Sequence, residues 1–160
     1  LSDTGAILDK VTDLVIGNFE KSLAEVKDGM DISLLSVNKR SGEINWSGAH
    51  NPLWYLEEGE LKELTADKQP IGKSDHRKSF TTQNIQCKAG STFFLFTDGF
   101  ADQFGGPRGK KFKYKSLQTL LISIQDKDME EQKNILVDTF INWKGKLEQV
   151  DDILIMGIRI

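Results

Sequence analysis

The sequence contains little cysteine, little proline and no long apolar run. Its 160 residues include one Cys and three Pro. The single cysteine, Cys87, excludes an internal disulfide framework and a thiolate zinc cluster, and we expect it to be a small buried hydrophobic residue. No apolar stretch approaches the roughly 20 residues that a membrane-spanning helix needs. We therefore expect no membrane contact by this segment.

The sequence also lacks a large excess of charge of either sign. The chain has 21 Lys and Arg against 24 Asp and Glu, a formal net charge of −3, so nothing draws the whole chain toward nucleic acid or an anionic membrane. Its length suits one compact domain over residues 1–160. Because the chain opens on Leu1 rather than Met and shows no signal peptide, we expect a cytoplasmic piece of a longer polypeptide.

The first half of the sequence predicts one helix and a series of hairpin strands. Apolar residues recur at three- and four-residue spacing between Ile7 and Phe19, which indicates an amphipathic helix that ends by Asp28-Gly29. Alternating or apolar segments separated by turn residues then predict antiparallel strands. These segments are residues 30–34, 43–46, 53–56, 61–64, 80–86 and 92–96. The last is apolar on both faces, so we expect a central buried strand.

The remaining segments complete an α+β pattern. The polar stretch 67–79 is predicted to be an exposed loop. Apolar stripes within 117–124 and 135–143 predict two helices, and residues 153–160, rich in branched side chains, predict a closing strand. A helix, hairpin strands, two helices and a final strand together predict an α+β layered sandwich.

Two acidic segments adjoin the predicted buried strands. Asp98-Gly99 follows strand 92–96 almost directly, and Asp151-Asp152 precedes the closing strand. Carboxylates at strand ends are held rigidly and can face a cleft, and such hard oxygen ligands suit Mg²⁺ or Mn²⁺. The alternative interpretation is structural, with Asp98-Gly99 as an ordinary turn and Asp151 as a solvated strand cap.

The histidines and one basic run allow two interpretations each. His50 lies in a predicted turn, where it could be a general acid or a hydrogen-bonding structural residue; His76 is predicted to be a loop residue. The run from Arg108 to Lys115 interleaves five basic residues with Phe112 and Tyr114. It could contact nucleic acid or a phosphorylated partner, or it could be a solvated edge whose aromatics pack inward. Five charges do not make a nucleic-acid-binding domain, so we predict no nucleic-acid partner.

Three stretches in this order resemble one family. Residues 94–99, Phe-Leu-Phe-Thr-Asp-Gly, resemble the motif in which an apolar strand delivers a metal-binding aspartate and glycine in PPM phosphatases. Residues 150–154, Val-Asp-Asp-Ile-Leu, resemble the closing acidic motif of that family. Residues 48–52, Gly-Ala-His-Asn-Pro, resemble the Ala-Gly-His-Pro turn of the SpoIIE-like bacterial branch. The resemblance covers essentially the whole chain.

The resemblance implies a fold and a chemistry. PPM phosphatases are αββα sandwiches with two Mn²⁺ or Mg²⁺ ions, which activate a water for attack on a phosphoserine or phosphothreonine without a covalent intermediate. By this resemblance Asp98 and Asp151 are metal ligands, Gly99 lets the backbone approach the metal site, and Asp152 and His50 are weaker candidates. The implied substrate is a phosphorylated regulatory protein, commonly one that controls a sigma factor, and the implied upstream partner is a sensor or receiver domain of the parent chain.

The sequence also departs from the family. The first metal-binding aspartates of PPM phosphatases lie on N-terminal strands, one in an Asp-x-Ser-Gly-His-Gly segment. When the shared motifs are aligned, this chain begins after those strands. We therefore expect a C-terminal portion of one phosphatase domain, with weak Mn²⁺ binding and little activity by itself. The lost strands would leave a sheet edge open, which leads us to expect a homodimer.

Two other functions fit the same residues. One is a phosphatase-fold module that docks or senses without catalysis, which the upstream sequence would distinguish from an enzyme. The other is an unrelated β-rich ligand-binding domain whose aspartates are turn residues. It predicts that Asp98→Asn changes stability slightly and metal affinity not at all.

Overall fold

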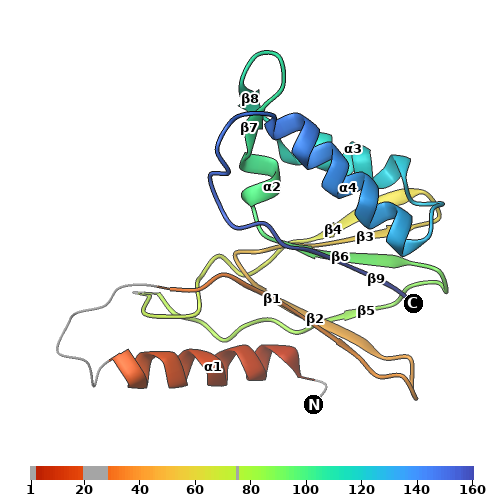
Figure 1. Ribbon diagram of the computed structural model, residues 1–160. Helices are drawn as coiled ribbons and strands as arrows, with labels where there is room; N and C mark the ends of the chain where they lie inside the picture. Colours follow the sequence, from red (N-terminus) through yellow and green to blue (C-terminus); the bar gives the residue numbers. More distant parts are fainter. Residues whose placement is uncertain (1–2, 20–28, 75) are drawn as a thin grey trace. The chain divides into compact units, whose positions relative to one another are not determined.

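The structure is a computed structural model that describes residues 3–19, 29–74 and 76–160 (Figure 1). The chain divides into two compact units. The first comprises Leu1–Leu53 and Glu63–Cys87, and the second comprises Trp54–Lys62 and Lys88–Ile160. No helix among the described residues is long and apolar enough to cross a membrane.

The first unit places one helix on a three-stranded antiparallel sheet. Helix α1 (Thr4–Phe19) lies along the sheet, whose strand order is β1 (Ile32–Val37), β2 (Ile44–Ala49) and β5 (Gln83–Ile85) (Figure 1). The carboxylate of Asp3 accepts a hydrogen bond from the backbone of Ala6 at 2.9 Å, which satisfies a free donor of the first turn. The predicted helix is confirmed over these residues, whereas the expected break at 28–29 falls partly outside the described residues.

The segment 67–79 differs from its prediction as an exposed loop. Ile71 is completely buried, in a cluster with Leu8, Ala49 and Phe80. Its backbone also pairs with that of Met30, with N···O distances of 2.8 and 2.9 Å. The prediction was wrong here because one apolar residue in a polar stretch is enough to anchor it to the core. The strand predicted at 80–86 likewise shortens to β5, since Phe80 packs into the same cluster.

The second unit covers a four-stranded antiparallel sheet with helices. The strand order is β4 (Glu60–Leu64), β3 (Leu53–Glu57), β6 (Thr92–Phe96) and β9 (Ile155–Arg159). Strand β6 therefore lies inside the sheet, as predicted, and Phe94 is 1% exposed. Helices α3 (Tyr114–Ser123) and α4 (Met129–Lys144) contribute Leu117, Leu121 and Leu136 to the core that covers this sheet.

Short elements connect β6 to the long helices. Helix α2 (Gly99–Asp102) begins two residues after β6, and a small hairpin of β7 (Phe104–Gly105) and β8 (Lys110–Lys111) follows α2. Gly106 and Gly109, both at positive φ, lie in the turn of this hairpin. Helix α4 begins at a side-chain cap, in which the Asp128 carboxylate accepts from the backbone of Glu131 at 2.8 Å.

Both units thus combine a sheet with helices, which confirms the α+β class. The prediction for Cys87 is also wrong: it is a free, half-buried thiol rather than a buried residue. It lies just after the short strand β5, at the end of the first unit, where the chain leaves the core.

Candidate metal centre

Asp98 lies between β6 and α2. It occupies the position before the first helical residue, with φ −72° and ψ −18°, and its side chain makes no capping hydrogen bond to the helix. The residue is exposed. Its backbone carbonyl accepts from the amide of Asp102 at 2.9 Å. The backbone is therefore fixed by the helix while the carboxylate is available to a ligand.

Asp151 and Asp152 lie just before β9, and both are exposed. One carboxylate oxygen of Asp151 accepts from the backbone amide of Asp152 at 2.7 Å. The side-chain amide of Gln149 donates to the carbonyl of Asp151 at 2.8 Å. These local bonds fix the backbone of the acidic pair and leave one carboxylate oxygen of Asp151 without a described hydrogen bond.

Thr97 joins the two acidic segments. Its backbone amide donates to the carbonyl of Leu154 at 3.0 Å, which extends the β6–β9 ladder by one residue. Its hydroxyl donates to the carbonyl of Asp152 at 2.9 Å and accepts from the amide of Leu154 at 3.0 Å. Sequence analysis missed this role; the only signal was a Thr between an apolar strand and an aspartate.

Gly99 permits the close approach of the same segments. A Cβ atom at this position would fall inside contact distance of the Asp152 carbonyl oxygen, and 3.1 Å from both the carbonyl carbon and the Cγ1 atom of Ile153. The structure therefore brings Asp98-Gly99 together with Asp151-Asp152, all within the second unit. A side chain at position 99 would collide with the backbone of the acidic pair, so this position requires glycine.

The pKa of Tyr114 reflects its burial and the negative charge of Asp98. Burial raises the pKa of its hydroxyl above the usual 10.0, and the negative charges of Asp98 and Asp102 raise this pKa further. The ring packs edge-on against Trp54, with 5.9 Å between centroids. Asp102 itself pairs with Lys111 at 2.9 Å. Sequence analysis considered Tyr114 only as part of the basic–aromatic run.

The donor chemistry fits a hard divalent cation, because exposed carboxylates and a nearby backbone carbonyl are the oxygen ligands that Mg²⁺ and Mn²⁺ prefer. Across residues 3–19, 29–74 and 76–160, however, no group of three or more His, Cys, Asp and Glu residues is arranged to hold a metal ion. The assignment of Asp98 and Asp151 as metal ligands therefore stays a prediction.

His50 belongs to the first unit. It adopts a left-handed backbone with φ 57° in the turn after β2. Its Nδ1 atom lies 2.9 Å from a carboxylate oxygen of Asp31, and its amide donates to the carbonyl of Asp67 at 2.9 Å. The structure thus places His50 in a turn with a hydrogen bond to a carboxylate, and its role stays a prediction. The partner Asp31 was missed, because a pair 19 residues apart leaves no local pattern.

Comparisons with known proteins identify a family and similar solved structures. The sequence matches the family described as Stage II sporulation protein E (SpoIIE) over residues 2–160. A comparison with curated proteins gave no match. The SiaA-PP2C domain of Pseudomonas aeruginosa is 28% identical with a TM-score of 0.87, and the match covers 99% of this chain and 61% of that one.

Two further solved structures have the same fold at lower identity. The phosphatase domain of SpoIIE from Bacillus subtilis is 15% identical with a TM-score of 0.58, covering 100% of this chain and 74% of that one. The PPM Ser-Thr phosphatase MsPP from Mycobacterium smegmatis is 11% identical with a TM-score of 0.61, covering 98% and 70%.

The fold is therefore that of a PP2C-type, or PPM, phosphatase domain, as the sequence predicted. The chain belongs to the SpoIIE family, the SpoIIE-like branch of these phosphatases. It spans about three fifths of the SiaA-PP2C chain that it matches.

Proposed function

We propose that the protein containing this chain is a Mn²⁺- or Mg²⁺-dependent phosphatase that hydrolyses phosphoserine or phosphothreonine on a regulatory protein, in the manner of signal-transduction phosphatases. The observation that carries the proposal is the joining of Asp98 and the Asp151-Asp152 pair at adjacent ends of β6 and β9 by Thr97 and Gly99. Membership of the SpoIIE family supports it, and so does the Mn presoaking described for a structure of the B. subtilis domain.

Each residue has a defined part in the proposal. The carboxylates of Asp98 and Asp151 would hold the metal, and bound divalent cations would supply an activated water and stabilise charge on the phosphoryl oxygens. Thr97 fixes the spacing of the two acidic segments, and Gly99 allows it. Asp152 contributes its backbone carbonyl to the Thr97 bond. The remaining ligands would come from a part of the full protein that corresponds to the portion of the SiaA-PP2C chain outside the match.

Hydrolysis of a phosphoserine peptide by the full-length protein tests the proposal. We expect turnover with Mn²⁺, none with EDTA, and a loss of at least 100-fold in kcat/KM for Asp98→Asn, because electrostatic stabilisation of this kind contributes roughly that factor or more. Asp126→Asn, an exposed aspartate on the α3–α4 connection, is the matched control and should keep full turnover. Full metal-dependent activity in Asp98→Asn would contradict the proposal. A folded protein without turnover on any phosphopeptide would favour a docking module of the same fold.

A further inference from the structure

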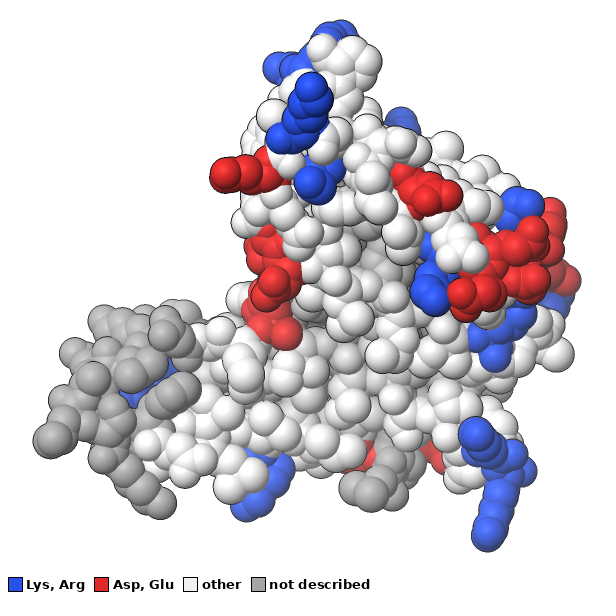
Figure 2. All heavy atoms as spheres, in the orientation of Figure 1, with Lys and Arg blue, Asp and Glu red and all other residues white. Residues whose placement is uncertain are grey.

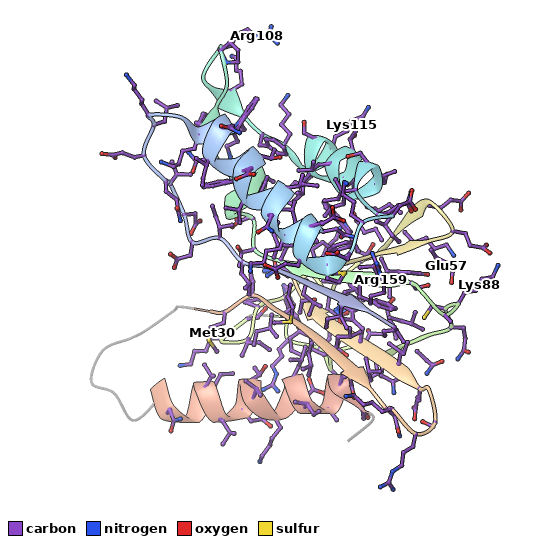
Figure 3. All side chains as sticks on the ribbon, turned by 45° about the vertical axis from the view of Figure 1, so that its right-hand side comes forward. Met30, Glu57, Lys88, Arg108, Lys115 and Arg159 are labelled. Atoms are coloured by element: carbon purple, nitrogen blue, oxygen red, sulfur yellow. The ribbon has the colours of Figure 1, made fainter. Side chains whose placement is uncertain are left out.

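The β7–β8 hairpin carries a concentration of positive charge that the proposed chemistry does not use. Five of the chain's 21 Lys and Arg residues lie between positions 108 and 115, and no Asp or Glu occurs between Asp102 and Asp126. Figure 2 shows Lys and Arg gathered over this hairpin. Arg108 lies at its tip and Lys115 on α3, and both side chains point away from the ribbon (Figure 3).

Most of this charge has no counter-ion in the described chain. Lys111 pairs with Asp102 at 2.9 Å and lies over the ring of Phe104 at 5.8 Å. The other four basic residues of the run are exposed, and the described residues give none of them an acidic partner. These four are Arg108, Lys110, Lys113 and Lys115. Unpaired, exposed cations on a chain that is acidic overall indicate a surface for an anionic ligand.

A cleft of about 490 Å³ lies between the hairpin and the end of α4. Its walls include the backbone of Gly105 and Gly106, the ring of Pro107, and Trp143. Lys144 and Lys146 add two cations at its other side, and the Nζ atom of Lys144 donates to the carbonyl of Leu147 at 3.1 Å. A groove with bare glycine backbone, apolar rings and lysine ammonium groups fits an extended chain with acidic side chains.

The cleft is rigidly built. The amide of Gly106 donates to the carbonyl of Trp143 at 2.8 Å, and the indole Nε1 of Trp143 donates to the carbonyl of Gln103 at 3.0 Å. Gln103 is completely buried, and its side-chain amide donates to the carbonyl of Glu148 at 2.8 Å. These bonds fix the hairpin to the end of α4 and to the segment after it, and a site that is already ordered loses less conformational entropy when a ligand binds.

The hairpin and the candidate metal centre both connect to α2 within the second unit. The amide of Lys113 donates to the carbonyl of Ala101 at 2.7 Å, so the chain leaving the hairpin is fixed to α2, which begins directly after Asp98. Tyr114, the next residue, lies close enough for the charge of Asp98 to raise its pKa. The hairpin is thus connected through α2 to the segment that carries Asp98.

We propose that the basic β7–β8 hairpin and the cleft beside it together dock an acidic polypeptide segment that flanks the phosphorylated residue of the substrate protein. The inference rests on the proposed phosphatase function and adds the kind of sequence that the substrate carries. A membrane is disfavoured as the occupant, because the exposed hairpin tip, Pro107 to Lys110, has no large apolar side chain. Nucleic acid is disfavoured by the small number of cations against 24 acidic residues in the chain.

The test compares two phosphoserine peptides that differ only in their flank, one with Asp and Glu and one with Asn and Gln. We expect the acidic peptide to have a KM about tenfold lower at low salt, and high salt to reduce this preference, because the attraction is screened. The double variant R108E/K110E should bring the ratio of the two KM values near one. K39E/R40E makes the same charge change on the exposed β1–β2 turn and should keep the full preference.

Binding separates this inference from the proposed function. Anisotropy of a fluorescent, unphosphorylated acidic peptide on the full-length protein should show saturable binding that R108E/K110E weakens about tenfold and K39E/R40E leaves unchanged. Such binding without any phosphopeptide turnover would uphold the docking surface and reject the phosphatase. Turnover with equal KM for the two flanks would reject the docking surface alone. Preferential binding of duplex DNA or of phosphatidylserine vesicles through Arg108 and Lys110 would overturn the choice of partner.

Discussion

Replacing Gly99 by Ala should loosen the contact on which the candidate metal centre depends. The added Cβ would lie 3.1 Å from the carbonyl carbon of Asp152 and from the Cγ1 atom of Ile153, and closer still to the Asp152 carbonyl oxygen. Backbone atoms of Asp152 on one side and the partly buried side chain of Ile153 on the other leave little room to relax. Overpacking of this kind costs roughly 1–3 kcal/mol, against a helix-propensity gain of up to about 1 kcal/mol, so we expect a net loss of about 1–2 kcal/mol.

Thermal unfolding measures the effect, with Gly17→Ala as the matched control. Gly17 lies inside α1, where an added Cβ meets nothing within 4 Å, so the same substitution should stabilise by about 0.5–1 kcal/mol. For a chain of this length we expect the Tm to fall by roughly 3–6 °C in Gly99→Ala and to rise by about 2 °C in the control. A Gly99→Ala protein as stable as the wild type would refute the close approach of the two acidic segments.

Two further predictions concern the same site. Thr97→Val removes the hydroxyl that bonds the Asp152 carbonyl, so it should cost about 1–2 kcal/mol in urea unfolding; Thr97→Ser should cost much less, and equal losses would contradict the assignment. Tyr114 should titrate above 10.0 by tyrosinate absorbance in a Tyr55→Phe background, and lower in Asp98→Asn, because the carboxylate charge raises its pKa. Since the folded state keeps this proton to higher pH than the unfolded chain does, the free energy of unfolding should fall as pH rises past about 10. A Tyr114 titration that Asp98→Asn leaves unchanged would contradict the electrostatic effect of Asp98 on Tyr114.

Sequence reasoning predicted the elements with strong local patterns. Residues 92–96 are apolar on both faces, and this segment became the interior strand β6 with the predicted bounds. The two apolar stripes correspond to α3 and α4, although both helices begin before their stripes because exposed polar residues also continue a helix. The positions of Asp98 and Asp151 at strand ends followed from the order of these elements.

Long-range contacts could not be predicted from these patterns. The bond between Thr97 and Asp152 joins residues 55 apart, and the pair of His50 and Asp31 joins residues 19 apart. Ile71 looked like part of a loop because its neighbours are polar, and only the fold shows the cluster that buries it. Local periodicity reports which face of an element is apolar, whereas such contacts depend on how elements pack in space.

Mn²⁺ binding tests the central claim most directly, since it reads the carboxylates without requiring turnover. Electron paramagnetic resonance of free Mn²⁺, titrated with the full-length protein and with Asp98→Asn, Asp151→Asn and Asp126→Asn, gives the affinity of each. Asp98→Asn and Asp151→Asn should each weaken binding by about tenfold or more, because each removes a charged oxygen ligand, while Asp126→Asn stays within about twofold. Equal affinity in all four proteins would contradict the assignment of Asp98 and Asp151 to a metal centre.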